Sequence, residues 1–361
     1  MLDLNELLRY TVEQQGSDLH VKVGSPPHVR VDGRLLVTSF ERVNPEDAER
    51  MAFAIMSKDR ADEFVQTAEA DFALGIPGLG RFRVNVFRQR GSVGLVFRRV
   101  LPGIPSFESL GLPPVVRRLA DEQRGLLLVT GPTGSGKTTT IAAMIDHIND
   151  TRPVNIVTVE DPIEVLHVDK KAIVNQREIG TDTVDYAVAM KRVLRQDPDV
   201  IFIGEMRDPE TVWAALAAAE TGHLVLSTLH TTNAVETVNR IVDFFPPFQQ
   251  KQVRLSLASS LRGVVSQRLL ERADGVGRVP SLEILVMTGR IFDRIVDPER
   301  GGNDTIDEII ADGEYYGMQS FDQSLFTLFK NGLVDLRNAM AAASNPHDFR
   351  VSLQQAGLLP A

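Results

Sequence analysis

The chain reads Leu126-Leu-Leu-Val-Thr130 and then Gly131-Pro-Thr-Gly-Ser-Gly-Lys137-Thr138, an apolar strand followed by a glycine-rich turn that opens a helix. The spacing is G-x4-G-K-[ST], a pattern in which backbone N–H groups and a helix N-terminus surround phosphate oxygens. The alternative is a glycine-rich turn without a ligand. It would require the lysine, the preceding strand and the following helix to occur together by chance. The stretch therefore predicts a phosphate-binding loop in an α/β fold.

Each residue of this loop has an expected role. Lys137 is expected to reach the outer phosphates of ATP, and the Thr138 hydroxyl is expected to ligate Mg²⁺. ATP and Mg²⁺ are thus the expected ligands. The predicted nucleotide-contacting residues are Gly131, Pro132, Thr133, Gly134, Ser135, Gly136, Lys137, Thr138 and Thr139.

Beyond residue 114, apolar strands alternate with amphipathic helices. Near-continuous apolar strands between helices are typical of a parallel sheet covered on both faces. From about residue 234 onward helices are expected to dominate, and only Ser281–Val286 resembles a further strand. The expected strands are 126–130, 155–159, 200–203 and 224–228, and the expected helices are 141–148, 184–194 and 209–220. One later helical stripe is predicted from Val253, Leu257, Leu261, Val264 and Val265.

The first hundred residues indicate a smaller α+β domain, with a helix near residue 4 followed by short strands and glycine turns. Residues 101–114, LPGIPSFESLGLPP, contain four prolines and two glycines, which exclude both a helix and a central strand there. We therefore expect one domain at 1–101, a linker at 102–114 and a second domain at 115–361.

A carboxylate is expected at the end of the strand 200–203. There Glu205 follows Gly204, which stands where many nucleotide-hydrolysing enzymes carry aspartate. We interpret Glu205 as acting on the metal through water, while Thr138 and the phosphates bind the metal directly. The alternative is a solvated acid at a strand end.

A second acidic loop, Glu160-Asp161-Pro-Ile-Glu164, follows the strand 155–159. Pro162 disfavours helical geometry at Asp161, so both glutamates are expected on a loop at the carboxyl end of a strand, where open α/β sheets bind ligands. One of the two glutamates is expected to orient the attacking water, and the sequence leaves open which one. A merely solvated loop is the alternative.

Two histidines, His223 and His230, bracket the strand 224–228. An imidazole at a strand end beside the phosphate loop can donate to a γ-phosphate and so report whether the nucleotide is a di- or triphosphate. We therefore expect sensor histidines, with histidines bonded to the backbone as the alternative. A metal-binding pair is improbable, because an extended strand of this length separates the two by roughly 23 Å.

Arginines lie on one face of a strand in the first domain, since Arg81 and Arg83 alternate with Phe82 and Val84, and Arg98 closes the next strand. A solvated basic strand is the simpler interpretation. The functional interpretation requires several copies of the chain in a ring. The guanidinium groups of one copy would then contact the ATP bound to the neighbouring copy, in trans.

The composition excludes several classes of protein. The 361 residues include 39 Lys+Arg, 48 Asp+Glu and no cysteine, so disulfides, thiol catalysis and Cys-ligated metal sites are excluded. A net charge of −9 gives no global reason to bind nucleic acid. The acidic N-terminus does not read as a signal peptide, and the apolar runs fall short of the roughly 20 residues of a membrane span. Any membrane association is therefore expected to be peripheral.

The segments GPTGSGKT, VEDPIE, GEMRDPET and TGHLVLSTLHTTNA, in this order and spacing, resemble the secretion-ATPase superfamily, and in particular the type IV pilus retraction (twitching motility) ATPases. SDLH, RFRVNVF and GMQSFDQSL extend the resemblance over nearly the whole chain. It implies a PAS-like first domain, a RecA-like second domain with C-terminal helices, and a homohexameric ring. In this family Mg²⁺-dependent hydrolysis of ATP to ADP and phosphate drives pilus disassembly through an inner-membrane platform protein, from the cytoplasmic face.

The resemblance also assigns motif names to positions of this sequence. The loop corresponds to Walker A, Glu160 to Glu164 to the Asp box, and Gly204-Glu205 to the end of Walker B. The two histidines fall in the His box. The family's interdomain arginines correspond to Arg81, Arg83 and Arg98.

The alternatives are another secretion-superfamily motor, such as an accessory pilus or type II or type IV secretion ATPase, and a ring-shaped nucleic-acid translocase. Pilus-extension and type II motors usually carry a four-cysteine zinc insertion, which a chain without cysteine cannot form. Residues 289–297 differ in charge from the AIRNLIRE-like segment of the retraction family, which leaves the mechanical output open.

A translocase requires a basic channel and stacking aromatics, yet aromatic residues make up only 6% of the chain. A subunit without turnover is disfavoured by the presence of Lys137, Thr138 and Glu205.

Overall fold

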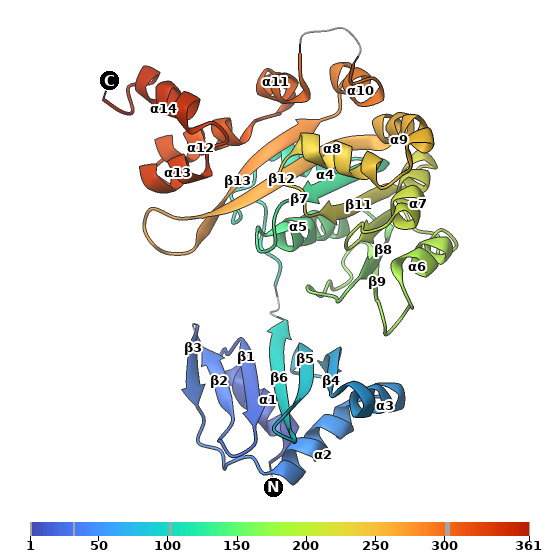
Figure 1. Ribbon diagram of the computed structural model, residues 1–361, viewed down its shortest axis with the longest axis vertical. Helices are drawn as coiled ribbons and strands as arrows, with labels where there is room; N and C mark the ends of the chain where they lie inside the picture. The colour runs from blue at the N-terminus through green and yellow to red at the C-terminus, as the bar shows by residue number, and fades with distance from the viewer. Residues whose placement is uncertain (1, 32, 101–102, 300–303, 361) are drawn as a thin grey trace. The chain divides into compact units, whose positions relative to one another are not determined.

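The computed structural model describes residues 2–31, 33–100, 103–299 and 304–360, and it divides into two compact units (Figure 1). The first unit comprises Met1–Gly103 and Pro162–Leu166, and the second comprises Ile104–Asp161 and His167–Ala361. Among the described residues, no helix has the length and apolar character needed to cross a membrane.

The first unit is built on a six-stranded sheet in the order β3-β2-β1-β6-β5-β4, with every pairing antiparallel. Cross-strand partners Val84 and Phe97 are buried in the core with the three helices, whereas their neighbours Arg83 and Arg98 lie on the opposite face. This alternation follows from the two-residue period of a strand. The elements are α1 (Leu4–Glu13), β1 (Asp18–Lys22), β2 (His28–Val31), β3 (Arg34–Val37), α2 (Pro45–Ile55), α3 (Lys58–Thr67), β4 (Glu69–Ile76), β5 (Gly80–Gln89) and β6 (Ser92–Val100).

The second unit is built on a seven-stranded sheet in the order β13-β12-β7-β11-β10-β8-β9. Its strands are β7 (Gly125–Thr130), β8 (Asn155–Glu160), β9 (Ile173–Glu178), β10 (Val200–Ile203), β11 (Leu224–Leu229), β12 (Leu261–Glu271) and β13 (Arg278–Val286). All neighbouring strands are parallel except β13, which runs antiparallel to β12. The expected parallel sheet is therefore present, with one antiparallel edge strand.

Helices cover both faces of this sheet. Leu126 and Leu128 of β7 join one hydrophobic core with α7, α8 and α9, while Leu127 and Val129 join a second core with α4 and α5. Such burial on both sides explains the near-continuous apolar sequence of the strand. The helices are α4 (Pro114–Ala120), α5 (Lys137–Thr151), α6 (Tyr186–Val193), α7 (Pro209–Glu220), α8 (Ala234–Asp243), α9 (Pro247–Ser260), α10 (Gly289–Val296) and α11 (Ile306–Ala311).

The expectation of a continuous helical stripe from Val253 to Val265 is wrong. Helix α9 ends at Ser260, and β12 begins at Leu261. Val264 faces one core and Val265 the other, as a strand between two helical layers requires. An apolar run of this kind fits a buried strand as well as a helix, so periodicity alone misassigned it.

The C-terminal helices lie beside the hairpin formed by β12 and β13 (Figure 1). They are preceded by a single 3-10 turn, η1 (Glu314–Tyr316), and comprise α12 (Phe321–Lys330), α13 (Leu336–Ala342) and α14 (Pro346–Gln355). Arg268 of β12 lies over the ring of Phe321, 3.8 Å from its centroid, and donates to the Ala342 carbonyl at 2.7 Å. These contacts fix the helices to the sheet.

The second unit begins earlier than the sequence suggested. Phe107 and Leu112, which fall within the expected linker, are buried in the core that contains α4 and α5. The start of that linker, Pro102, lies outside the described residues, as does Leu101. Prolines here shape a segment that packs on the sheet.

Candidate nucleotide-binding site

The phosphate loop connects the carboxyl end of β7 to the N-terminus of α5. Gly131 and Gly136 have φ angles of 144° and 89°, which residues other than glycine rarely adopt. Lys137, the first residue of α5, is only 8% exposed, and its Nζ donates to the carbonyls of Gly131 at 2.7 Å and Pro132 at 3.1 Å. The lysine cation is thus held directly over the loop.

Ser135 supplies a polar group that suits a phosphate. Its hydroxyl is buried within the loop and has no hydrogen-bond partner among the residues that the structure describes. A buried hydroxyl without a partner is unfavourable unless a ligand completes its bonding. The α5 N-terminus has no side-chain cap either, because its N-cap is Gly136. Together with Lys137, these donors fit the phosphates of a nucleotide.

Glu205 follows β10, at the same edge of the sheet as the loop, and its side chain is largely buried. Arg207 donates from its Nε to Glu205 Oε2 at 2.7 Å, and His230 Nε2 lies 3.3 Å from Glu205 Oε1. The hydrogen bond to Glu205 raises the pKa of Arg207. The carboxylate is therefore held between two cationic or polarisable groups.

Tyr186 of α6 lies beside the cluster that Glu205 forms with Arg207 and His230. Burial raises the pKa of its phenol above the usual value, and the nearby acids Asp161, Glu160 and Glu205 act in the same direction. A Cβ added at Gly204 would lie 2.8 Å from the Tyr186 hydroxyl. Gly204 therefore allows the close approach of the phenol.

The two acidic-loop glutamates have different environments. Glu160 is the last residue of β8 and is buried, and its Oε1 accepts from Thr158 at 2.6 Å and from Gln176 at 3.1 Å. Because β8 lies beside β10 in the parallel sheet, Glu160 and Glu205 end neighbouring strands at one edge. Glu164 instead belongs to the first unit, where it lies 3.5 Å from Arg83. Of these two glutamates, Glu160 is therefore the one that shares a unit and a sheet edge with Glu205.

The structure separates the two histidines. His230 follows β11 at the edge that holds the loop, but His223 precedes β11, and its carbonyl accepts from the N–H of Gly125 at the start of β7. The expectation that both lie beside the phosphate loop is therefore wrong for His223, because the parallel strands place it at the opposite edge of the sheet. Its Nδ1 lies 3.0 Å from the Ala218 carbonyl, so His223 fits the alternative of a histidine bonded to the backbone.

The predicted arginines lie on the polar face of the first unit's sheet. Arg81 and Arg83 belong to β5, and Arg98 of β6 donates to Asp18 at 2.8 Å. Burial raises the pKa of Asp18, but hydrogen bonds from Arg98 and Ser17 outweigh it, so the pKa lies below its usual value. Arg98 is thus engaged within its own unit.

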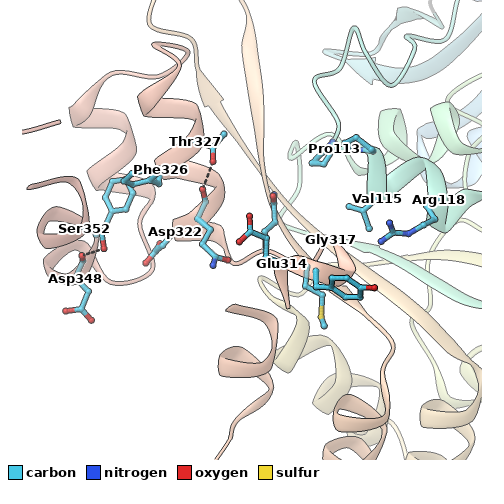
Figure 2. A pocket seen from close by; sticks show the side chains of 16 residues that line it. Pro113, Val115, Arg118, Glu314, Gly317, Asp322, Phe326, Thr327, Asp348 and Ser352 are labelled. Atoms are coloured by element: carbon cyan, nitrogen blue, oxygen red, sulfur yellow. Dashed lines mark hydrogen bonds between the residues drawn. The ribbon is translucent and has the colours of Figure 1, made fainter. Parts of the chain in front are cut away.

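The described residues line several cavities outside the loop. One of about 330 Å³ is lined by Glu205, Arg207 and His230 together with Glu236 and Arg240 of α8. Another, of about 760 Å³, lies between α4, η1, α12 and α14, and Figure 2 shows Arg118, Glu314 and Phe326 around it. The second cavity contains none of the predicted site residues.

A metal site made by protein side chains alone is not present in the described part of the chain, where no group of three or more His, Asp or Glu could hold an ion. Mg²⁺ commonly binds through one or two protein groups plus substrate phosphates and water. The available groups, the Thr138 hydroxyl and Glu205, fit that mode of binding.

Several residues of the site were not found from the sequence. Arg207 and Tyr186 surround Glu205, and Gln176 contacts Glu160. Gln267 of β12 contacts the loop itself. The GEMRD segment could have pointed to Arg207, since it lies two residues from the carboxylate, but the other three come from distant segments without a local signature.

Comparison with known proteins agrees with this geometry. The family described as type II/IV secretion system protein matches residues 4–289. The type IV pilus retraction ATPase PilT of Pseudomonas aeruginosa is 42% identical over 348 residues, which cover 96% of this chain and 100% of that protein. This chain belongs to the PilT-like ATPases of that family. A twitching motility protein of Neisseria gonorrhoeae is 44% identical over 88% of this chain and 84% of its own length.

Solved structures that are similar to this chain confirm the fold. A crystal structure of the pilus retraction motor PilT with bound ADP matches with a TM-score of 0.88 and 46% identity, over 96% of this chain and 99% of that chain. The ATPase DotB of Legionella pneumophila matches with a TM-score of 0.73 and 26% identity, over 93% of this chain and 94% of that chain. The expected fold class, a RecA-like ATPase domain preceded by a smaller domain, is therefore confirmed, and so is nucleotide use.

Proposed function

We propose that this chain is the Mg²⁺-dependent ATPase motor of type IV pilus retraction, acting as a homohexamer that hydrolyses ATP to ADP and phosphate. The observation that carries the proposal is the likeness to PilT over 96% of this chain and 100% of the relative. Type II secretion system protein E of P. aeruginosa is a weaker guide, because it is 36% identical and the match covers only 53% of it.

The residues of the second unit divide the chemistry of hydrolysis. Lys137 neutralises negative charge on the outer phosphates as the bond breaks. The Thr138 hydroxyl and phosphate oxygens would hold Mg²⁺ directly, Glu205 would act on it through water, and the ion would add positive charge at the phosphates. Of the two acidic-loop glutamates, Glu160 is proposed to orient the attacking water, because it ends the strand beside the one that precedes Glu205. Its burial and two hydrogen bonds support a fixed orientation.

His230 is proposed as the nucleotide sensor. Its Nε2 lies 3.3 Å from Glu205 Oε1, so a contact between the imidazole and a γ-phosphate would compete with this pairing. Loss of the phosphate would return the imidazole to the carboxylate. His223 lies at the opposite edge of the sheet from Glu205, so it is not part of this proposal.

Mechanical work requires docking on other components of the machinery. We infer that the hexamer docks on the inner-membrane platform protein of the pilus, at the cytoplasmic face and with peripheral membrane contact only. The net charge of −9 supports the absence of a nucleic-acid partner.

Two measurements test the function. Purified protein should release phosphate from ATP with Mg²⁺ but not with excess EDTA, and single-stranded DNA should not change the rate. Stimulation by DNA would favour a translocase, and no release under any condition would refute the ATPase assignment. In a strain without its own retraction ATPase, the chain should restore twitching.

An accessory pilus ATPase is the second candidate, because the type IV pilus ATPase PilU of P. aeruginosa is 39% identical over 98% of this chain and 92% of that protein. The same genetic test separates the two candidates. A retraction motor restores twitching in a strain that lacks PilT, whereas an accessory ATPase restores function only in a strain that lacks PilU and retains PilT.

The trans role of the first-unit arginines has its own test. Hexamers mixed from Arg81→Ala/Arg83→Ala subunits and Lys137→Ala subunits should regain part of the phosphate release if the arginines act on a neighbour's ATP. Demonstrably mixed hexamers that regain none would place Arg81 and Arg83 in a same-chain or structural role.

A further inference from the structure

One buried side chain of β12, Gln267, joins the phosphate loop to the neighbouring strand. Its Nε2 donates to the Ser135 carbonyl at 2.7 Å, and its Oε1 accepts from the Thr140 hydroxyl at 2.7 Å. Gln267 is 3% exposed and Thr140 is 1% exposed, so no solvent competes for these bonds. The loop and the first turn of α5 are thus held at two points by one amide.

Two glycines of the loop leave the space that this strand requires. A Cβ at Gly136 would lie 2.7 Å from Gln267 Nε2, and a Cβ at Gly131 would lie 2.3 Å from the Gln267 carbonyl oxygen. Both contacts are shorter than a real Cβ tolerates. The glycines therefore permit packing against β12 as well as the approach of phosphate.

The bond to Ser135 sets the direction of the next amide. In a planar trans peptide, the C=O of Ser135 and the N–H of Gly136 point to opposite sides. Because Gln267 draws the Ser135 carbonyl toward β12, the Gly136 N–H points away from β12. Backbone N–H groups in this part of a phosphate loop are the donors that bind phosphate oxygens.

We propose that Gln267 is a positioning residue for the nucleotide phosphates, because it orients the loop amide after Ser135 without touching the nucleotide. This inference rests on the nucleotide binding of the proposed function. The competing explanation is that Gln267 only fills and stabilises the interior. The two explanations differ in what they predict for binding by folded protein.

The first test measures ADP affinity by titration calorimetry, which requires no turnover. Gln267→Met keeps the approximate size of the side chain but removes both hydrogen bonds. The dissociation constant for ADP should rise at least about tenfold, as expected when a hydrogen bond to a charged group is lost. Val264→Ala is the control, because it creates a cavity in the same strand on the opposite face, in the core that contains α7, α8 and α9. It should lower the melting temperature and leave the ADP affinity unchanged.

The second test uses Gln267→Glu, which still accepts from Thr140 but places a carboxylate oxygen against the Ser135 carbonyl. Protonation of a buried carboxyl restores a donor at that position. The ADP affinity of Gln267→Glu, relative to that of Gln267→Met, should therefore improve as the pH is lowered from about 8 to about 6. A purely space-filling role predicts no such pH profile.

The outcomes distinguish nucleotide binding by the chain from the positioning role of Gln267. If the wild type does not bind ADP, the proposed function fails and the role of Gln267 fails with it. If the wild type binds but Gln267→Met binds within about twofold of it, only the positioning role is overturned. Should Gln267→Met fail to fold, the wild type becomes the reference, and a flat pH profile for the ADP affinity of Gln267→Glu relative to the wild type would overturn the positioning role.

Discussion

Replacing Glu283 with glutamine should stabilise the second unit, and the effect should grow with pH. Glu283 lies in β13, is 6% exposed, and accepts from the N–H of Ala234 at the start of α8, at 2.7 Å. Burial raises the pKa of this carboxyl from 4.5 to about 7, and Asp307 adds to the effect, although the Ala234 N–H opposes it. Glutamine keeps the acceptor oxygen and removes the ionisation.

The expected size follows from the difference between folded and unfolded protein. An acid whose pKa is raised on folding stabilises the fold fully below its unfolded pKa, and this stabilisation is lost as the pH rises through the folded value. Each pKa unit corresponds to about 1.4 kcal/mol, so Glu283 costs about 3 kcal/mol at pH 8. At pH 5 the cost is only about 1 kcal/mol, because the folded carboxyl is still protonated.

Thermal melting of wild type and Glu283→Gln at both pH values measures this effect. For a unit of this size, the variant should melt about 6–12 °C higher at pH 8 and only about 2–4 °C higher at pH 5. Glu210→Gln, which changes an exposed acid on α7, is the control for simple loss of charge and should have little effect at either pH. A difference between wild type and Glu283→Gln that does not change with pH would refute the reasoning.

Three further predictions concern the motor itself. Lys137→Ala should abolish phosphate release, and activity within about threefold of wild type would contradict its assigned role. Glu205→Gln should retain ATP binding while the turnover rate falls by about 10²–10⁴, measured by calorimetry and phosphate release; lost binding would show that the carboxylate is required for affinity. Arg290→Ala combined with Asp293→Ala on α10 should preserve phosphate release but weaken pilus retraction, measured by tether retraction. Equal loss of both activities would assign α10 to the structure of the catalytic ring.

The fold of the second unit was predictable where the sequence carries a local signal. Strands β7, β8, β10 and β11 were expected, because a strand buried on both faces needs an apolar run and helices separate these runs. Strand β12 was missed, because Leu257, Leu261 and Val264 fit a helical stripe even though the helix ends at Ser260. Gly263 and the β-branched pair Val264-Val265 are the local features of that run that favour a strand.

The site, like the fold, was predictable where its residues lie in local sequence motifs. Lys137 and Glu205 follow from spacing along the chain, because the loop and the strand ends are local features. His223 was misplaced, because a histidine at either end of a strand looks alike in sequence, while only the carboxyl ends of parallel strands share the edge with the loop. Gln267 and Tyr186 reach the site only through tertiary packing.

The close approach between Gly204 and Tyr186 limits how this site can change over generations. A Cβ at position 204 would lie 2.8 Å from the phenol hydroxyl, so a larger residue at 204 requires the tyrosine to move or to be replaced. A replacement at 204 is therefore less costly where position 186 already carries a smaller residue. Lineages should therefore carry paired substitutions at these two positions, and a protein with tyrosine at 186 should have kept glycine at 204.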